Sequence, residues 1–198
     1  MNPHPAGGRR APGFTAVEIL VVLAIVAILA AVITPQVIGR IRESRQSALS
    51  QTFFGLSQGI AEYKKAVARY PSYLTLLTTT PVLNTATDAC GNLLSQANIV
   101  NWRGPYVSRQ LLSGGIPMGD AHIQNALRRV TSGSSVFLLM DAANVDTLIA
   151  IGLEAEFDGT PANAAGGTIQ YTTAAVGPLP AAPPKTVNLS YSIPIAGC

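Results

Sequence analysis

The stretch FTAVEILVVLAIVAILAAVI, which runs from Phe14 to Ile33, decides the fold of this 198-residue chain. Its only polar side chains are those of Thr15 and Glu18. A helix of about 20 apolar residues covers about 30 Å, which is the thickness of the hydrocarbon core of a bilayer. Because the core helix of a soluble domain is rarely apolar on every face, the sequence predicts a membrane-spanning helix.

The segment before this helix, residues 1–13, is a polar leader whose only charged side chains are Arg9 and Arg10. Positive charge at this end predicts that the leader stays in the cytoplasm while the rest of the chain crosses the membrane. A secretory signal peptide has a shorter apolar region, about 7–15 residues, followed by an A-x-A site, and neither feature is present. A plain membrane anchor would explain the length of the helix but not Glu18, since a carboxylate in hydrocarbon costs a few kcal/mol unless a partner satisfies it.

The run Gly13-Phe14-Thr15-Ala16-Val17-Glu18, followed by an unbroken apolar helix, resembles the prepilin signature of type IV pilins and of type II secretion pseudopilins. In that family a membrane peptidase cleaves after the glycine and methylates the new N-terminal phenylalanine. The resemblance therefore implies cleavage between Gly13 and Phe14, with the apolar helix retained. Pro35 strengthens the resemblance, because pilin helices commonly carry a proline near this point, where it bends or loosens the helix.

The resemblance also implies a role for Glu18, which in this family is thought to pair with the N-terminal amine of a neighbouring subunit. Such a pair neutralises two costly charges in the filament core and sets the register of the subunits. Contacts among helices over residues 19–33 would supply most of the cohesion. The implied partners are copies of this chain, alone or with minor pilins, the prepilin peptidase, an inner-membrane assembly platform and, before assembly, the bacterial inner membrane itself.

Beyond Pro35 the sequence becomes amphipathic. Its spacing of three and four residues predicts that the helix continues to Tyr70, with Pro71 ending it, and that one face packs on a globular head. The apolar face consists of Leu49, Phe53, Leu56, Ile60, Tyr63, Val67 and Tyr70. We therefore expect a leader over residues 1–13, a helix over 14–70 with 14–33 as its membrane and filament-core part, and a head over 71–198.

The head is predicted to contain an antiparallel sheet of three or four strands, which makes the chain α+β with the architecture of a pilin. The expected strands are residues 135–140, 147–153, 168–173 and 187–193. A helix is expected over 121–130, and a surface loop with a short helix over 81–100. The run Trp102-Arg103-Gly104-Pro105-Tyr106 resembles the W-x-GPY turn of some major pseudopilins.

Two features of the head bear on disulfides and metals. Outside the cytoplasm, Cys90 and Cys198 allow one intramolecular disulfide, and the family often staples its C-terminal region in this way. Free thiols and a disulfide between subunits are the alternatives. Some major pseudopilins bind calcium in the head, and carboxylates cluster late in this chain, but they lack EF-hand spacing and are better explained by turns and a solvated face. These carboxylates are Asp141, Asp146, Glu154, Glu156 and Asp158. We assign no metal ligand and expect no cofactor.

Composition excludes several other classes. Hydrophobic residues make up 48% of the chain and charged ones only 12%, which argues against disorder. The net charge of +3 falls to +1 without Arg9 and Arg10 (11 basic minus 10 acidic residues), so no nucleic-acid partner is predicted.

No complete catalytic set is present, so we expect no enzyme. Ser57 fits G-x-S-x-G, but it lies in a helical context, and His122 is the only histidine outside the leader. The function predicted is a structural pilin subunit of an extracellular filament. A pseudopilin of a periplasmic filament and, as a lesser alternative, a membrane-anchored binding protein remain open.

Overall fold

A computed structural model describes residues 15–159, 167–172 and 185–196, and divides the chain into two compact units. The first unit ends at Ile41 and the second begins at Arg42. Helix α1 (Ala16–Val67) contributes residues to both units. Each unit is described by itself below, beginning with the second.

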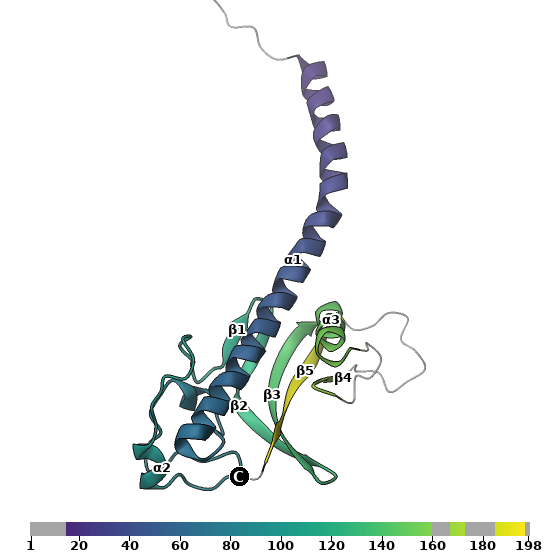
Figure 1. The fold of residues 1–198 in the computed structure, drawn as a ribbon. Helices are drawn as coiled ribbons and strands as arrows, with labels where there is room; N and C mark the ends of the chain where they lie inside the picture. Colours follow the sequence, from purple (N-terminus) through teal and green to yellow (C-terminus); the bar gives the residue numbers. More distant parts are fainter. Residues whose placement is uncertain (1–14, 160–166, 173–184, 197–198) are drawn as a thin grey trace, which may run out of the picture. The chain divides into compact units, whose positions relative to one another are not determined.

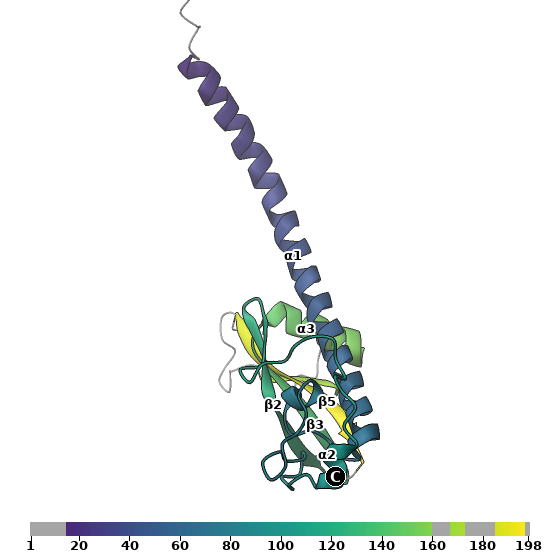
Figure 2. The same ribbon diagram turned by 90° about the vertical axis from the view of Figure 1, so that its left-hand side faces the viewer.

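The second unit is an antiparallel sheet with helices on one face (Figures 1 and 2). The strands follow the order β1-β2-β3-β5-β4, and every neighbouring pair is antiparallel. The prediction of an α+β chain is confirmed, although the sheet has five strands rather than three or four. The elements are η1 (Leu74–Leu77), α2 (Gln96–Val100), β1 (Ile116–Met118), β2 (Ala121–Ser132), β3 (Ser135–Asp146), α3 (Thr147–Asp158), β4 (Ile169–Thr172) and β5 (Thr186–Ile195).

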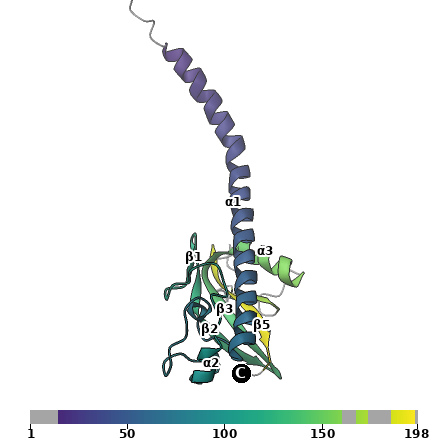
Figure 3. The same ribbon diagram turned by 60° about the vertical axis from the view of Figure 1, so that its left-hand side comes forward.

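The core lies between the sheet and residues 42–67 of α1, which run in front of β3 and β5 in Figure 3. The apolar face predicted for this helix is buried from Leu49 to Val67. Phe53 stacks on Tyr191 of β5, with ring centroids 5.1 Å apart, and Phe157 of α3 meets the same ring edge-on at 5.3 Å. Both helices therefore share one anchor on the sheet, and each fully buried large apolar side chain contributes about 1.5–3 kcal/mol.

Helix α1 ends at Val67, three residues before the predicted end at Tyr70. Ala68 adopts a left-handed conformation with φ of 61°, and its N–H donates to the carbonyl of Lys64 at 2.9 Å. A residue in this conformation cannot continue a right-handed helix. The helix therefore ends at this turn and not at Pro71, which was predicted to end it.

The strand predicted over residues 147–153 is wrong, because this segment forms helix α3. The Asp146 carboxylate caps the helix by accepting from the Leu148 N–H at 2.8 Å, and Gly159 ends it with φ of 74°. The apolar residues that favoured a buried strand instead fall at helical spacing on the buried face. A short apolar run does not distinguish a buried strand from a buried helix.

The helix predicted over residues 121–130 is also wrong, because these residues belong to strand β2. The sequence AHIQNALRRV favours a helix locally, but it lies between two strands that hydrogen-bond to it, β1 and β3. Gly119 and Gly133, both with positive φ, form the turns at its ends. Pairing with neighbouring strands overrides the local preference.

The Trp102–Tyr106 turn and the short helix in the loop before it are both found where they were predicted. The loop helix is α2, and the turn contains a cis Gly104–Pro105 bond. The Trp102 indole N–H donates to the carbonyl of Leu76 at 3.0 Å, and the Tyr106 ring packs edge-on against Tyr63 of α1 at 5.7 Å. The turn therefore fixes the loop to α1 through aromatic side chains.

An ion pair joins three strands on the sheet face opposite to α1. Arg128 of β2 donates two hydrogen bonds, at 2.8 and 3.0 Å, to Asp141 of β3, which also accepts from Ser190 of β5. Partial burial raises the pKa of Asp141, but the hydrogen bonds from Arg128 and Ser190 and the arginine charge outweigh it, so the pKa lies below the ordinary value of 3.8. The ionised carboxylate thus stabilises the fold.

We expect Asp141→Asn to lower the free energy of unfolding by about 1–2 kcal/mol at neutral pH. Because the pKa of Asp141 is lower in the folded protein, its contribution to stability is fully present at pH values well above the ordinary pKa of 3.8. This contribution is lost as the pH falls through the lower pKa of the folded protein. Denaturant unfolding of the full-length protein in detergent, followed by the fluorescence of the single tryptophan, Trp102, measures this difference.

Asp120→Asn is the matched control. Asp120 pairs with Arg45 at 3.0 Å, but its side chain is 82% exposed, so its loss should cost under about 0.5 kcal/mol. Equal stability of wild type and Asp141→Asn at neutral pH, or a difference that stays unchanged down to about pH 2.5, would contradict the role of Asp141.

Candidate functional site

The candidate site is the apolar part of α1 in the first unit. Its large apolar side chains over residues 17–33 are between 48 and 68% exposed, and none of the most apolar 18-residue window is buried. By length and composition this helix is able to cross a membrane. The predicted apolar helix is therefore present, and its surface is compatible with membrane anchoring.

Glu18 lies in the first turn of this helix and is bonded to Thr15. Its Oε2 atom accepts from the backbone N–H and from the hydroxyl of Thr15, both at 2.9 Å. In return the Thr15 hydroxyl accepts from the Glu18 N–H at 3.3 Å. This reciprocal arrangement is a capping box, which satisfies amide groups that a helix N-terminus would otherwise leave unpaired.

The capping box gives Glu18 a partner inside its own chain, which the sequence interpretation missed. The signal was present, because Thr15-Ala16-Val17-Glu18 fits the pattern of a threonine followed three residues later by an acidic residue before an apolar run. Both hydrogen bonds end on Oε2, so Oε1 has acceptor capacity for a second donor. The cap and an ion pair with another subunit are therefore chemically compatible.

The other predicted site residues are placed as follows. Gly13 and Phe14 lie outside the described residues, so the cleavage site stays a prediction. The backbone of Pro35 lies within α1. Cys90 lies in a partly buried turn, and the described part of the chain holds no free cysteine. Cys198 lies outside the described residues, so its pairing with Cys90 also stays a prediction.

The late carboxylates have separate structural roles. Glu154 is buried and accepts from the Tyr171 hydroxyl at 2.9 Å, and Glu156 accepts from the Ser50 hydroxyl at 2.7 Å. Asp158 accepts from two backbone amides at the start of β4. Desolvation and the hydrogen bond to Glu154 raise the pKa of Tyr171 to about 12. Within residues 15–159, 167–172 and 185–196, no group of three His, Cys, Asp or Glu could hold a metal ion.

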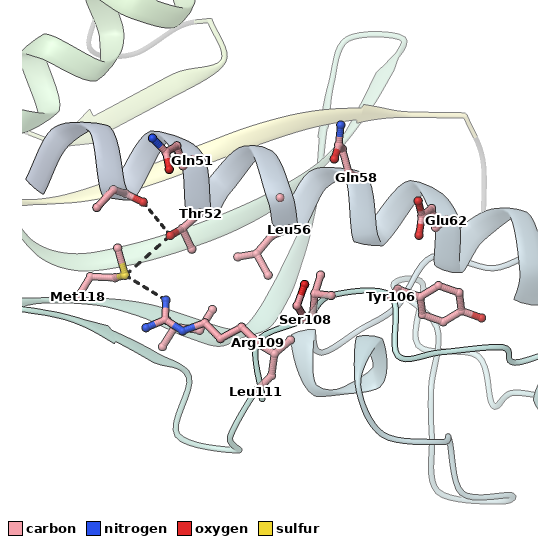
Figure 4. A pocket seen from close by; sticks show the side chains of 14 residues that line it. Gln51, Thr52, Leu56, Gln58, Glu62, Tyr106, Ser108, Arg109, Leu111 and Met118 are labelled. Atoms are coloured by element: carbon pink, nitrogen blue, oxygen red, sulfur yellow. Dashed lines mark hydrogen bonds between the residues drawn. The ribbon is translucent and has the colours of Figure 1, made fainter. Parts of the chain in front are cut away.

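An open groove of about 630 Å³ lies in the second unit between α1 and the segment 106–118 (Figure 4). Small residues of α1, Ala48 and Gly55, leave room for it, and Leu111 and Ile116 line it with apolar surface. Glu62 and Arg109 bring opposite charges to its walls. The groove was not predicted, because it forms only when the segment after the Trp102–Tyr106 turn folds back beside α1.

No protein-family model, curated protein or solved structure matches this chain. Among the described residues, the feature with the most specific chemistry is the acidic side chain of Glu18 in the exposed apolar helix.

We expect Thr15→Ala to loosen the first turn of α1, because it removes the hydroxyl that bonds to Glu18 in both directions. An N-cap of this kind contributes about 0.5–2 kcal/mol, so amide hydrogen exchange at Glu18 should quicken by about five- to tenfold. The measurement is exchange mass spectrometry of the full-length protein in detergent. Thr15→Ser keeps a hydroxyl and should exchange like wild type, and equal exchange in all three proteins would contradict the cap.

Proposed function

We propose that this chain is a structural subunit of a type IV pilus-like helical filament. It is made as a membrane-inserted precursor, cleaved after Gly13 by a prepilin peptidase and assembled through packing of its N-terminal helices. Before assembly it resides in the bacterial inner membrane, and afterwards it forms an extracellular filament. Its partners are other copies of the chain and the inner-membrane assembly platform.

The observation that carries the proposal is an acidic side chain in a helix whose apolar surface is exposed on every face. Such a surface is stable in lipid or among other apolar helices, but not in water. The capping box leaves Oε1 of Glu18 with acceptor capacity, and the amine of a cleaved Phe14 in a neighbouring subunit is a cation of the right charge. A single ion pair per subunit then selects one register among helices that are otherwise similar along their length.

The apolar helix also has a surface suited to packing against copies of itself. Ala24, Ala27 and Ala31 follow one another at spacings of three and four residues, which places small side chains on one face. In membranes, helices associate through such faces because small residues let the backbones approach closely. Within this proposal the exposed apolar residues exchange lipid contacts for contacts with neighbouring subunits.

The second candidate function is a type II secretion pseudopilin, favoured by the Trp102–Tyr106 turn. The aromatic contacts of this turn fit the W-x-GPY resemblance. In either filament we propose a disulfide between Cys90 and Cys198 that ties the C-terminus to the head. A membrane-anchored binding protein is the lesser candidate, and the groove between α1 and residues 106–118 is the observation in its favour.

The test compares filaments from cells that carry Glu18→Gln, Thr15→Ala or wild type. Glu18→Gln keeps an amide that can cap the helix but removes the charge, whereas Thr15→Ala keeps the charge and removes the cap. Breaking a buried charge pair costs about 3–5 kcal/mol, so Glu18→Gln should lower the filament yield by at least about tenfold. The Glu18→Gln precursor should still insert into the membrane. Thr15→Ala should assemble to within about twofold of wild type, because the cap contributes only about 1 kcal/mol.

Electron microscopy and immunoblotting of sheared surface material give the yield. Glu62→Gln, the same substitution elsewhere on α1, is the matched control and should assemble normally. Normal filaments from Glu18→Gln would contradict the role of the charge. Filaments confined to the periplasm would favour the pseudopilin, and a membrane-bound protein that never polymerises would favour the anchored binding protein.

A further inference from the structure

The sulfur of Met118 lies beside the Arg109 guanidinium in the groove of the second unit (Figure 4). Arg109 donates to it from Nη1 at 3.4 Å. The Thr52 hydroxyl of α1 lies 3.9 Å from the sulfur, but its one proton already goes to the Ala48 carbonyl at 2.7 Å. A thioether sulfur is a weak acceptor, so an oxygen atom attached to it would offer Arg109 a stronger one.

Met118 is also the more accessible of the two methionines in the second unit. It is partly exposed and lines the open groove, as well as a smaller cavity of about 130 Å³ beside Asp120 and Lys185. Met140, in the centre of β3, has an exposed fraction of 0% and belongs to the core. Because oxidation of methionine follows access to the sulfur, the two residues should react at very different rates.

We propose that Met118 is a site of oxidative modification by peroxides, and that the folded groove accommodates its sulfoxide. In the reaction, the sulfur attacks one peroxide oxygen, the O–O bond breaks and an S–O bond forms. The sulfur is oxidised by two electrons, and hydrogen peroxide is reduced and leaves as water. Arg109 then donates to the new sulfoxide oxygen.

The modification changes the groove rather than the core. A sulfoxide is polar, so buried methionines usually disrupt packing when they are oxidised. At Met118 the added oxygen meets the Arg109 guanidinium, which is already in place on the segment 106–118. The oxidised side chain is therefore held by a charged donor and makes the lining of the groove more polar.

The first test is the rate and position of oxidation. The full-length protein in detergent is treated with hydrogen peroxide, digested with trypsin and mapped by mass spectrometry. Arg128 and Arg129 lie between the two methionines, so trypsin separates Met118 from Met140. We expect Met118 to gain one oxygen at least about tenfold faster than Met140, and equal rates would overturn the proposal.

The second test asks whether Arg109 holds the sulfoxide. Oxidation at Met118 should lower the Tm of wild type, read by Trp102 fluorescence, by under about 2 °C. It should lower the Tm of Arg109→Ala by about 4 °C or more. Arg129→Ala, an exposed arginine on β2, is the matched control and should behave as wild type.

Met118→Leu keeps the side-chain volume and should show no change in Tm after the same treatment. An equal loss of Tm on oxidation in wild type and Arg109→Ala would overturn the accommodation by Arg109. Both tests use the unassembled protein in detergent, so their outcome is independent of whether the chain forms a filament.

Discussion

Glu18 places a carboxylate in a helix whose neighbouring large side chains are all apolar and exposed. Among lipid tails or packed apolar helices, an ionised carboxylate is stable only with donors or a cation beside it. Thr15 supplies two donors from within the chain, and both bonds end on one carboxylate oxygen. The proposed filament uses the other oxygen, so one side chain serves both the start of the helix and the register between subunits.

The second unit meets a different constraint, because residues 42–67 of α1 must be held by a sheet rather than by lipid. Tyr191 contacts an aromatic ring from each of the two helices, and the Trp102–Tyr106 turn fixes the preceding loop to α1. The groove beside α1 follows from this packing, since the segment after the turn lies along the helix without filling the space next to Ala48 and Gly55. Its lining places the Met118 sulfur beside the Arg109 guanidinium, and the oxidation proposed there is separate from assembly.

Local sequence patterns predicted correctly the helices and strands whose structure depends mainly on residues close together in the sequence. The spacing from Leu49 to Val67 identified the buried face of α1. Strands β3, β4 and β5 coincide with predicted strands, β3 from its apolar run and β4 from its alternating residues. The helix predicted over residues 121–130 and the strand predicted over 147–153 were wrong because strand pairing and the Asp146 cap, rather than local preference, decide their structure. The Thr15–Glu18 cap was predictable from its spacing, whereas the groove depends on contacts between segments far apart in sequence, such as that between Thr52 and Met118, which are 66 residues apart.

Filament assembly, as proposed here, requires that the mature protein keeps the apolar helix after the leader is removed. The intact mass and the N-terminal peptide of the mature protein from its native cells test this. We expect a chain that begins at Phe14, carries one added methyl group on its amine and still contains residues 15–33. A mature chain that begins after Ile33, or one that keeps Met1 and the whole leader, would contradict it.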